Sequence, residues 1–131
     1  MKFGAIYGLI AGIIAEIVGA IMVLIILRIG LPHWTSPTTP ISSIVFKEIT
    51  INVIWGIIFG IFYSILYDSI PNKGIFKGIV YGLMIWLICG IRGASYEIAY
   101  DRTINAISYN IYTFVVIVLA YGTMLGYLYR K

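Results

Sequence analysis

The chain has 131 residues, of which 61% are hydrophobic and 11% are charged, and its mean hydropathy is +1.01. Such a chain has too little polar surface to cover a water-soluble globule of this size, so the composition predicts an integral membrane protein. The net charge of +4 comes from basic residues that stand at the ends of apolar runs and form no tract, which argues against nucleic acid as a partner.

The first apolar run extends from Phe3 to Leu27, longer than the roughly 20 residues with which a helix crosses a bilayer. It is too long for the core of a secretory signal, so we expect a retained membrane helix. Small residues recur at every fourth position of this run and are interrupted by one carboxylate: Gly4, Gly8, Gly12, Glu16 and Ala20. Small residues at this spacing let two helix backbones approach closely in lipid, so we expect the stripe to face protein.

Glu16 is the main candidate for a functional site, because holding a charge at mid-bilayer costs about 2.5 to 3.5 kcal/mol on insertion scales. A carboxylate buried without a partner favours its protonated form, which would make Glu16 a proton carrier. In the competing hypothesis, a neutral Glu16 donates one hydrogen bond to a backbone carbonyl or a tyrosine hydroxyl and only docks helices. The sequence leaves both open.

Residues 30–40 hold three of the four prolines, so we expect an irregular loop on the outer surface with His33 and Trp34 at the membrane interface.

The second and third apolar runs, Ile49 to Tyr67 and Ile75 to Ile91, are joined by a short turn, which predicts antiparallel neighbouring helices. The third run is short for a span unless its helix continues past Arg92 through Ala94. If the first and third helices touch, Arg92 would be a countercharge that keeps Glu16 ionised.

The fourth run extends from Thr103 to Tyr129. The four runs predict an all-α fold, a four-helix transmembrane bundle with glycine-mediated close helix packing. We assign residues 1–131 to one integral membrane domain, with spans at about 3–28, 48–68, 74–95 and 104–129. The predicted packing positions are Gly4, Gly8, Gly12, Gly56, Gly60, Gly78, Gly82, Gly122 and Gly126.

Each run also carries an aromatic residue followed by glycine: Tyr7-Gly8, Trp55-Gly56, Tyr81-Gly82 and Tyr121-Gly122. This similarity predicts an internal duplication, although a match of this length also arises from composition alone, because glycine is common in membrane helices.

Basic residues are divided almost evenly between the two faces of the membrane. One face has Lys2, Lys73, Lys77, Arg130 and Lys131, and the other has Arg28, Lys47, Arg92 and Arg102. The positive-inside rule therefore favours cytoplasmic termini in a multi-pass protein of the cell membrane and leaves a dual topology open.

The sequence contains no recognisable motif for catalysis or metal binding. Cys89 is the only cysteine and His33 the only histidine, so neither a thiolate cluster nor a histidine site can be assembled. The chain lacks a glycine-rich phosphate loop and a serine elbow. We therefore expect no metal, no cofactor and no enzymatic activity.

Two resemblances involve different parts of the chain. The stretch Ile14-Ala15-Glu16-Ile17-Val18-Gly19 resembles the small multidrug resistance transporters, in which a first-helix glutamate binds cationic substrate or protons. This resemblance covers about one helix, implies a coupling role for Glu16 in an antiparallel or dual-topology dimer, and does not extend to the Trp-and-Gly pattern of that family's third span. Residues 54–82, with Pro71 in their turn, are similar to small membrane proteins of the YagU type.

Two functions follow from these observations. The first is an oligomerising or accessory component of a membrane complex, whose partners are the lipid bilayer and either further copies of the chain or other subunits. It is favoured by the number of small-residue stripes and the small extramembrane portion. The alternative is a small proton- or cation-coupled transporter or channel that works through Glu16.

Overall fold

The fold consists of helices. The computed structural model describes residues 2–30 and 41–129, and these ranges contain no β-strand. The first three spans lie in α1 (Lys2–Arg28), α2 (Ile41–Leu66) and α3 (Gly74–Ala99), and one turn of 3-10 helix, η1 (Tyr67–Ser69), follows α2. The fourth span is a continuous helix made of α4 (Thr103–Thr113), the π-helical segment η2 (Phe114–Gly122) and α5 (Thr123–Leu128).

Four helical segments are long and apolar enough to cross a membrane, namely Phe3–Ile26, Ile49–Ser69, Gly74–Ala99 and Thr103–Leu128. The prediction of an all-α four-helix bundle is therefore confirmed, and the chain is a multi-pass membrane protein. The predicted loop at residues 30–40, with His33 and Trp34, lies almost wholly outside the described residues.

Two helices are longer than the predicted spans. Helix α2 begins at Ile41 rather than near residue 48, and α3 ends at Ala99 rather than near residue 95. The predicted second span begins directly after Lys47, whereas the predicted third span already continues past Arg92 to about residue 95. A charge ends a hydrophobic run but not a helix, because a long basic side chain at the membrane edge reaches water.

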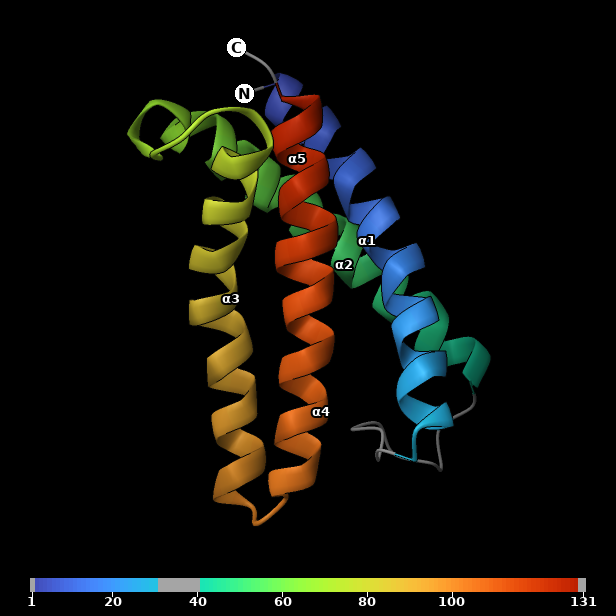
Figure 1. Cartoon of the computed structure of the whole chain (residues 1–131). Helices are drawn as coiled ribbons and strands as arrows, with labels where there is room; N and C mark the ends of the chain where they lie inside the picture. The colour runs from blue at the N-terminus through green and yellow to red at the C-terminus, as the bar shows by residue number, and fades with distance from the viewer. Residues whose placement is uncertain (1, 31–40, 130–131) are drawn as a thin grey trace.

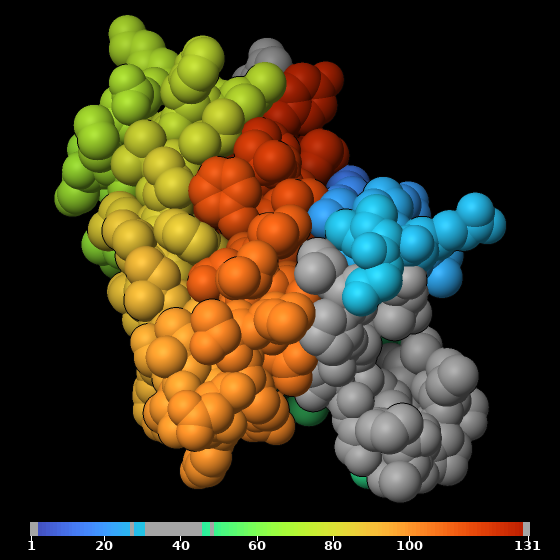
Figure 2. All heavy atoms as spheres, turned by 60° about the horizontal axis from the view of Figure 1, so that its bottom comes forward, coloured from blue at the N-terminus to red at the C-terminus, as the bar shows by residue number. Residues whose placement is uncertain are grey.

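The four spans are arranged as two antiparallel pairs. Helix α1 packs against α2 and also against the fourth span, which in turn packs against α3. Figure 2 shows the fourth span, in orange, between α3 and α1. In Figure 1 the two pairs lie close together at the end that carries both termini and diverge toward the turn between α3 and α4.

Glycine makes the contact in the α1–α2 pair. A Cβ added to Gly60 would lie 2.6 Å from the Cα of Gly8, and one added to Gly56 would lie 3.1 Å from the Cα of Gly12. A Cβ added to Gly4 would lie 2.7 Å from Ser64. The backbones therefore approach so closely that larger residues would push the helices apart.

The α3–fourth-span pair repeats this contact. A Cβ added to Gly126 would lie 2.9 Å from the Cα of Gly78, and one added to Gly122 would lie 3.4 Å from the Cα of Gly82. A Cβ on Gly126 would also meet the carbonyl oxygen of Gly74 at 2.7 Å, as one on Gly60 would meet that of Gly4. Each predicted packing glycine thus lies at one of two matching helix crossings.

The matching contacts define the register of the two halves. Gly56 corresponds to Gly122, as the aromatic–glycine pairs suggest. Gly8, however, corresponds to Gly78 and not to Gly82, so the Tyr81-Gly82 pair is displaced by one helical turn from the Tyr7-Gly8 pair.

A buried lysine connects α3 to the end of α2. Lys77 is 7% exposed, and its Nζ donates a hydrogen bond to the carbonyl of Tyr67 and lies 3.9 Å from the centroid of the Tyr67 ring. A cation is favourable at a helix C-terminus, where carbonyl groups lack partners. Tyr63 and Tyr129 pack beside Tyr67, with ring centroids 5.5 and 5.0 Å from it, and Tyr81 packs on Tyr63. These rings fill the bundle at the end that carries the termini.

Candidate functional site

Glu16 and Asn52 form a polar pair in the α1–α2 contact. Gly4, Gly8 and Gly12 lie opposite Ser64, Gly60 and Gly56, and the next turn of each helix brings Glu16 opposite Asn52. The Asn52 Nδ2 donates a hydrogen bond to Glu16 Oε1. A stripe with a period of four residues drifts around a helix of 3.6 residues per turn, so this pair lies at the edge of the crossing.

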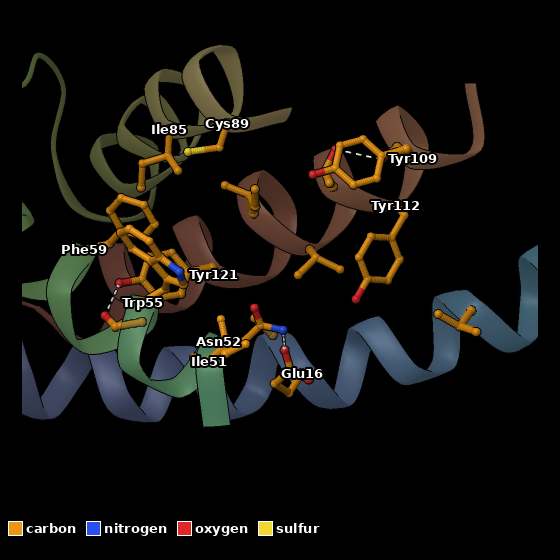
Figure 3. A pocket seen from close by; sticks show the side chains of 17 residues that line it. Glu16, Ile51, Asn52, Trp55, Phe59, Ile85, Cys89, Tyr109, Tyr112 and Tyr121 are labelled. Atoms are coloured by element: carbon orange, nitrogen blue, oxygen red, sulfur yellow. Dashed lines mark hydrogen bonds between the residues drawn. The ribbon is translucent and has the colours of Figure 1, made fainter. Parts of the chain in front are cut away.

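A cavity of about 400 Å³ lies beside this pair. Helix α1 contributes Gly12 and Glu16 to its wall, and α2 contributes Asn52. Ile85 and Cys89 of α3 line the facing side, together with residues of the fourth span. Figure 3 shows the Glu16 side chain among these residues, with its carboxylate toward Asn52. The cavity thus lies between the two helix pairs and receives residues from all four spans.

Five aromatic side chains dominate the cavity wall: Trp55, Phe59, Tyr109, Tyr112 and Tyr121. Trp55 and Phe59 are stacked with ring centroids 5.3 Å apart, and the Tyr121 hydroxyl donates a 2.7 Å hydrogen bond to the Gly56 carbonyl. The hydrogen bond holds the Tyr121 ring against α2, the helix that carries Trp55 and Phe59.

The hydroxyl of Tyr112 reaches α1 one turn beyond Glu16. A Cβ added to Gly19 would lie 2.8 Å from this hydroxyl oxygen, so a larger residue there would require the Tyr112 side chain to shift. Gly19 therefore leaves room for the Tyr112 hydroxyl beside α1.

The π-helical segment η2 forms part of the same wall through Val116, Ile117 and Tyr121. π-Helical turns are rare and occur frequently at functional sites. Residues 115–118 are all β-branched, a composition that crowds the side chains of an α-helix. The sequence analysis did not identify this distortion.

The cavity is suited to a cation. Glu16 is the one acidic residue among the described residues of its wall, and none of them is lysine, arginine or histidine. A carboxylate attracts a positive charge strongly in a membrane interior, where water does not screen it. Aromatic faces attract ammonium groups through their quadrupoles. Together these groups can bind either a proton or an organic cation.

The structure does not bring Arg92 into this site. Arg92 is exposed and is absent from the cavity wall, and α1 packs on α2 and the fourth span rather than along α3. Near the turn between α3 and α4, Arg102 Nε lies 2.9 Å from Glu97 Oε2, so these two charges pair with each other. Within the described residues, no group of three or more His, Cys, Asp or Glu side chains could hold a metal ion.

Sequence reasoning identified Glu16 but not its partner or the aromatic wall. The signal for Asn52 was present, because Asn52 continues the stripe of Gly56 and Gly60 just as Glu16 continues that of Gly8 and Gly12. Matching the two stripes in antiparallel order predicts the pair. The aromatic residues carry no such signal, since tyrosine and phenylalanine also face lipid.

The resemblance of the first span to small multidrug resistance transporters remains a prediction from residues 14–19, and the YagU-type resemblance remains one from residues 54–82. Neither resemblance extends over the aromatic residues of the fourth span that line the cavity. Comparisons of this chain with protein-family models, with curated proteins and with solved structures give no match.

Proposed function

We propose that this protein is a small membrane transporter that binds an organic cation in the cavity beside Glu16 and couples its movement to protons. The observation that carries the proposal is the position of the Glu16 carboxylate in an aromatic-lined cavity of about 400 Å³ between two helix pairs. Pockets that hold small ligands have volumes in this range, with a few polar groups in a mainly apolar wall.

Coupling requires one side chain that can bind either the proton or the organic cation. A carboxylate binds either a proton or a cation, so each expels the other from Glu16. The Asn52 amide stabilises the carboxylate through a hydrogen bond without adding a positive charge. It therefore positions the carboxylate without supplying a countercharge that would compete with a ligand.

The arrangement of the helices supports movement as well as binding. The glycine crossings join α1 to α2 and α3 to the fourth span, while the cavity lies between the two pairs. Each pair is therefore a rigid unit, and a change in the angle between the pairs would alter access to the cavity without breaking either crossing.

Binding of tetramethylammonium to the purified protein in nanodiscs tests the proposal. We expect binding to weaken as pH falls, because protons compete for the carboxylate, and Glu16→Gln to abolish binding and its pH dependence while the protein stays folded. Asp101→Asn is the matched control, since Asp101 is exposed at the α3–α4 turn and its backbone, with φ of 58°, also suits asparagine. In liposomes, Glu16→Gln should also lose the uptake of tetramethylammonium that a pH gradient drives in wild type. Equal binding by wild type and Glu16→Gln would refute the proposal.

The prediction of an oligomerising or accessory component rested on the number of small-residue stripes, the small extramembrane portion and the absence of a catalytic pattern. Both glycine stripes of each half now have partners within one chain, so they no longer require a second copy. The accessory role becomes the better account if Glu16→Gln leaves ion binding and flux unchanged while the loss of an associated subunit changes the stability or assembly of the protein.

A further inference from the structure

Two tyrosines of the second helix pair donate hydrogen bonds to the backbone of α2. The hydroxyl of Tyr121, in the fourth span, donates to the carbonyl of Gly56, and the hydroxyl of Tyr81, in α3, donates to the carbonyl of Phe59, each at 2.7 Å. Both tyrosines are buried. A carbonyl oxygen has two lone pairs, so it can accept a hydroxyl and still accept its hydrogen bond within the helix. The two bonds therefore connect α2 to both helices of the second pair within one helical turn.

These bonds lie where the helix backbones do not pack closely. In the described residues, the backbone of α2 packs on α1 and makes no extended contact with α3 or the fourth span. The backbone contact between the two pairs is formed by α1 and the fourth span instead. The bond from Lys77 to the Tyr67 carbonyl lies beside the turn at which the chain itself joins α2 to α3. The two tyrosine bonds, and not a glycine crossing, therefore hold α2 to the second pair away from that turn.

The two bonds also border the cavity. Gly56, Phe59 and Tyr121 line its wall, and Figure 3 shows Tyr121 beside Phe59, whereas Tyr81 does not line it. From these residues toward the chain termini, buried side chains of the core fill the bundle. A change in the angle between the pairs that opens the cavity toward the termini would move α2 away from α3 and the fourth span, so it would break both bonds.

We infer that the hydrogen bonds of Tyr81 and Tyr121 to α2 form a latch, which keeps the cavity closed toward the end that carries the termini and breaks in each transport cycle. The inference rests on the proposed function, because that function requires the angle between the pairs to change. A hydrogen bond between membrane helices shifts an equilibrium roughly threefold on average. Two such bonds bias the bundle toward the closed arrangement and still allow it to open.

Tyr81→Phe tests the latch, because it removes one of the two bonds and leaves the cavity wall unaltered. Tyr63→Phe is the matched control. The ring of Tyr63 packs on that of Tyr81 with centroids 5.0 Å apart, and its buried hydroxyl has no hydrogen-bond partner in the described residues. Both variants lose one buried hydroxyl in the same cluster of rings, and only Tyr81→Phe loses a bond to α2.

Opening is measured in nanodiscs as the rate at which N-ethylmaleimide labels a single cysteine, after Cys89, the only cysteine of the chain, is replaced by serine. Ala11→Cys and Ala120→Cys are the two reporters. Both residues are buried in the core cluster that contains the latch tyrosines, and neither lines the cavity. Ala106→Cys reports general loosening of the bundle, because Ala106 in α4 is buried outside that cluster.

We expect Tyr81→Phe to raise the labelling rate of both reporters about threefold relative to Tyr63→Phe, and to leave the labelling rate of Ala106→Cys unchanged. Saturating tetramethylammonium should raise the labelling rate of the reporters when the latch is intact, because the loaded protein must open. The same ion should have no effect in a reporter that also carries Glu16→Gln.

The other outcomes separate this inference from the proposed function. Equal labelling rates in Tyr81→Phe and Tyr63→Phe, or an equal increase at Ala106→Cys, would overturn the latch and leave cation binding at Glu16 standing. A latch that opens faster in Tyr81→Phe but does not respond to bound tetramethylammonium would overturn its part in the transport cycle. If tetramethylammonium does not bind through Glu16, the proposed function fails, and the transport role of the latch fails with it.

Discussion

The two glycines Gly8 and Gly12 lie one turn apart in α1, and we expect the same substitution to have opposite consequences at them. A Cβ added to Gly8 would meet the carbonyl oxygen of Gly56 and lie 2.8 Å from the Cα of Gly60, both of which are backbone atoms that cannot turn aside. A Cβ added to Gly12 would lie 3.4 Å from the Cα of Gly56 and 3.8 Å from the carbonyl oxygen of Asn52, which is ordinary contact.

The magnitude follows from two contributions. Replacing glycine by alanine inside a helix raises helix propensity by about 1 kcal/mol, and this gain is common to both positions. Overpacking at Gly8 costs about 1 to 3 kcal/mol, because the helices must separate. We therefore expect the free energy of unfolding of Gly8→Ala to be about 1 to 3 kcal/mol lower than that of Gly12→Ala, with Gly12→Ala equal to or above wild type.

The assay is reversible unfolding in mixed micelles with increasing sodium dodecyl sulfate, followed by circular dichroism and tryptophan fluorescence. Each variant is compared with wild type under the same lipid and detergent conditions. Equal stabilities of Gly8→Ala and Gly12→Ala would refute the close approach of α1 and α2 at Gly8.

Two further predictions use the same assay. Tyr121→Phe removes a hydroxyl that donates a 2.7 Å hydrogen bond to the Gly56 carbonyl, so it should lower the free energy of unfolding by about 0.5 to 1.5 kcal/mol. Tyr63→Phe removes a buried hydroxyl that has no hydrogen-bond partner in the described residues, so it should be neutral or stabilising. A larger loss of stability with Tyr63→Phe than with Tyr121→Phe would contradict the hydrogen-bond assignment. Lys77→Ala removes both the hydrogen bond to the Tyr67 carbonyl and the ammonium group 3.9 Å from that ring, so it should destabilise the protein by about 1 to 3 kcal/mol. An unchanged unfolding midpoint would show that this lysine does not hold α3 to the end of α2.

Much of the fold could be predicted because the membrane restricts the chain to a few solutions. A run of about 20 apolar residues in lipid must be helical to satisfy its own backbone hydrogen bonds, and this is why the four spans follow from the sequence. The helix ends were less predictable, since the charge of Lys47 ends an apolar run and not the helix, which begins at Ile41.

Only the site residues that belong to the small-residue stripes of α1 and α2 could be predicted. Glu16 stands out as the one acid in its apolar run, and Asn52 follows from the antiparallel order of the two stripes. Tyr109 and Tyr112 could not be assigned in this way, because which face of the fourth span meets α1 depends on the angle between the helix pairs. The π-helical geometry of η2 changes that face further, by altering the number of residues per turn.

The two halves of the bundle share one packing scheme and differ at the helical turn beyond the glycines. In the first half, the turn beyond the glycines brings Glu16 to Asn52. The equivalent position on α3 is Trp86, whose indole N–H donates a 3.2 Å hydrogen bond to Thr113 Oγ1 and whose ring packs edge-on against Phe114 at 5.2 Å. The second half thus has a bulky aromatic residue where the first has a carboxylate. A repeated scaffold with this one exchange therefore gives a cavity whose described wall has a single acidic side chain, Glu16.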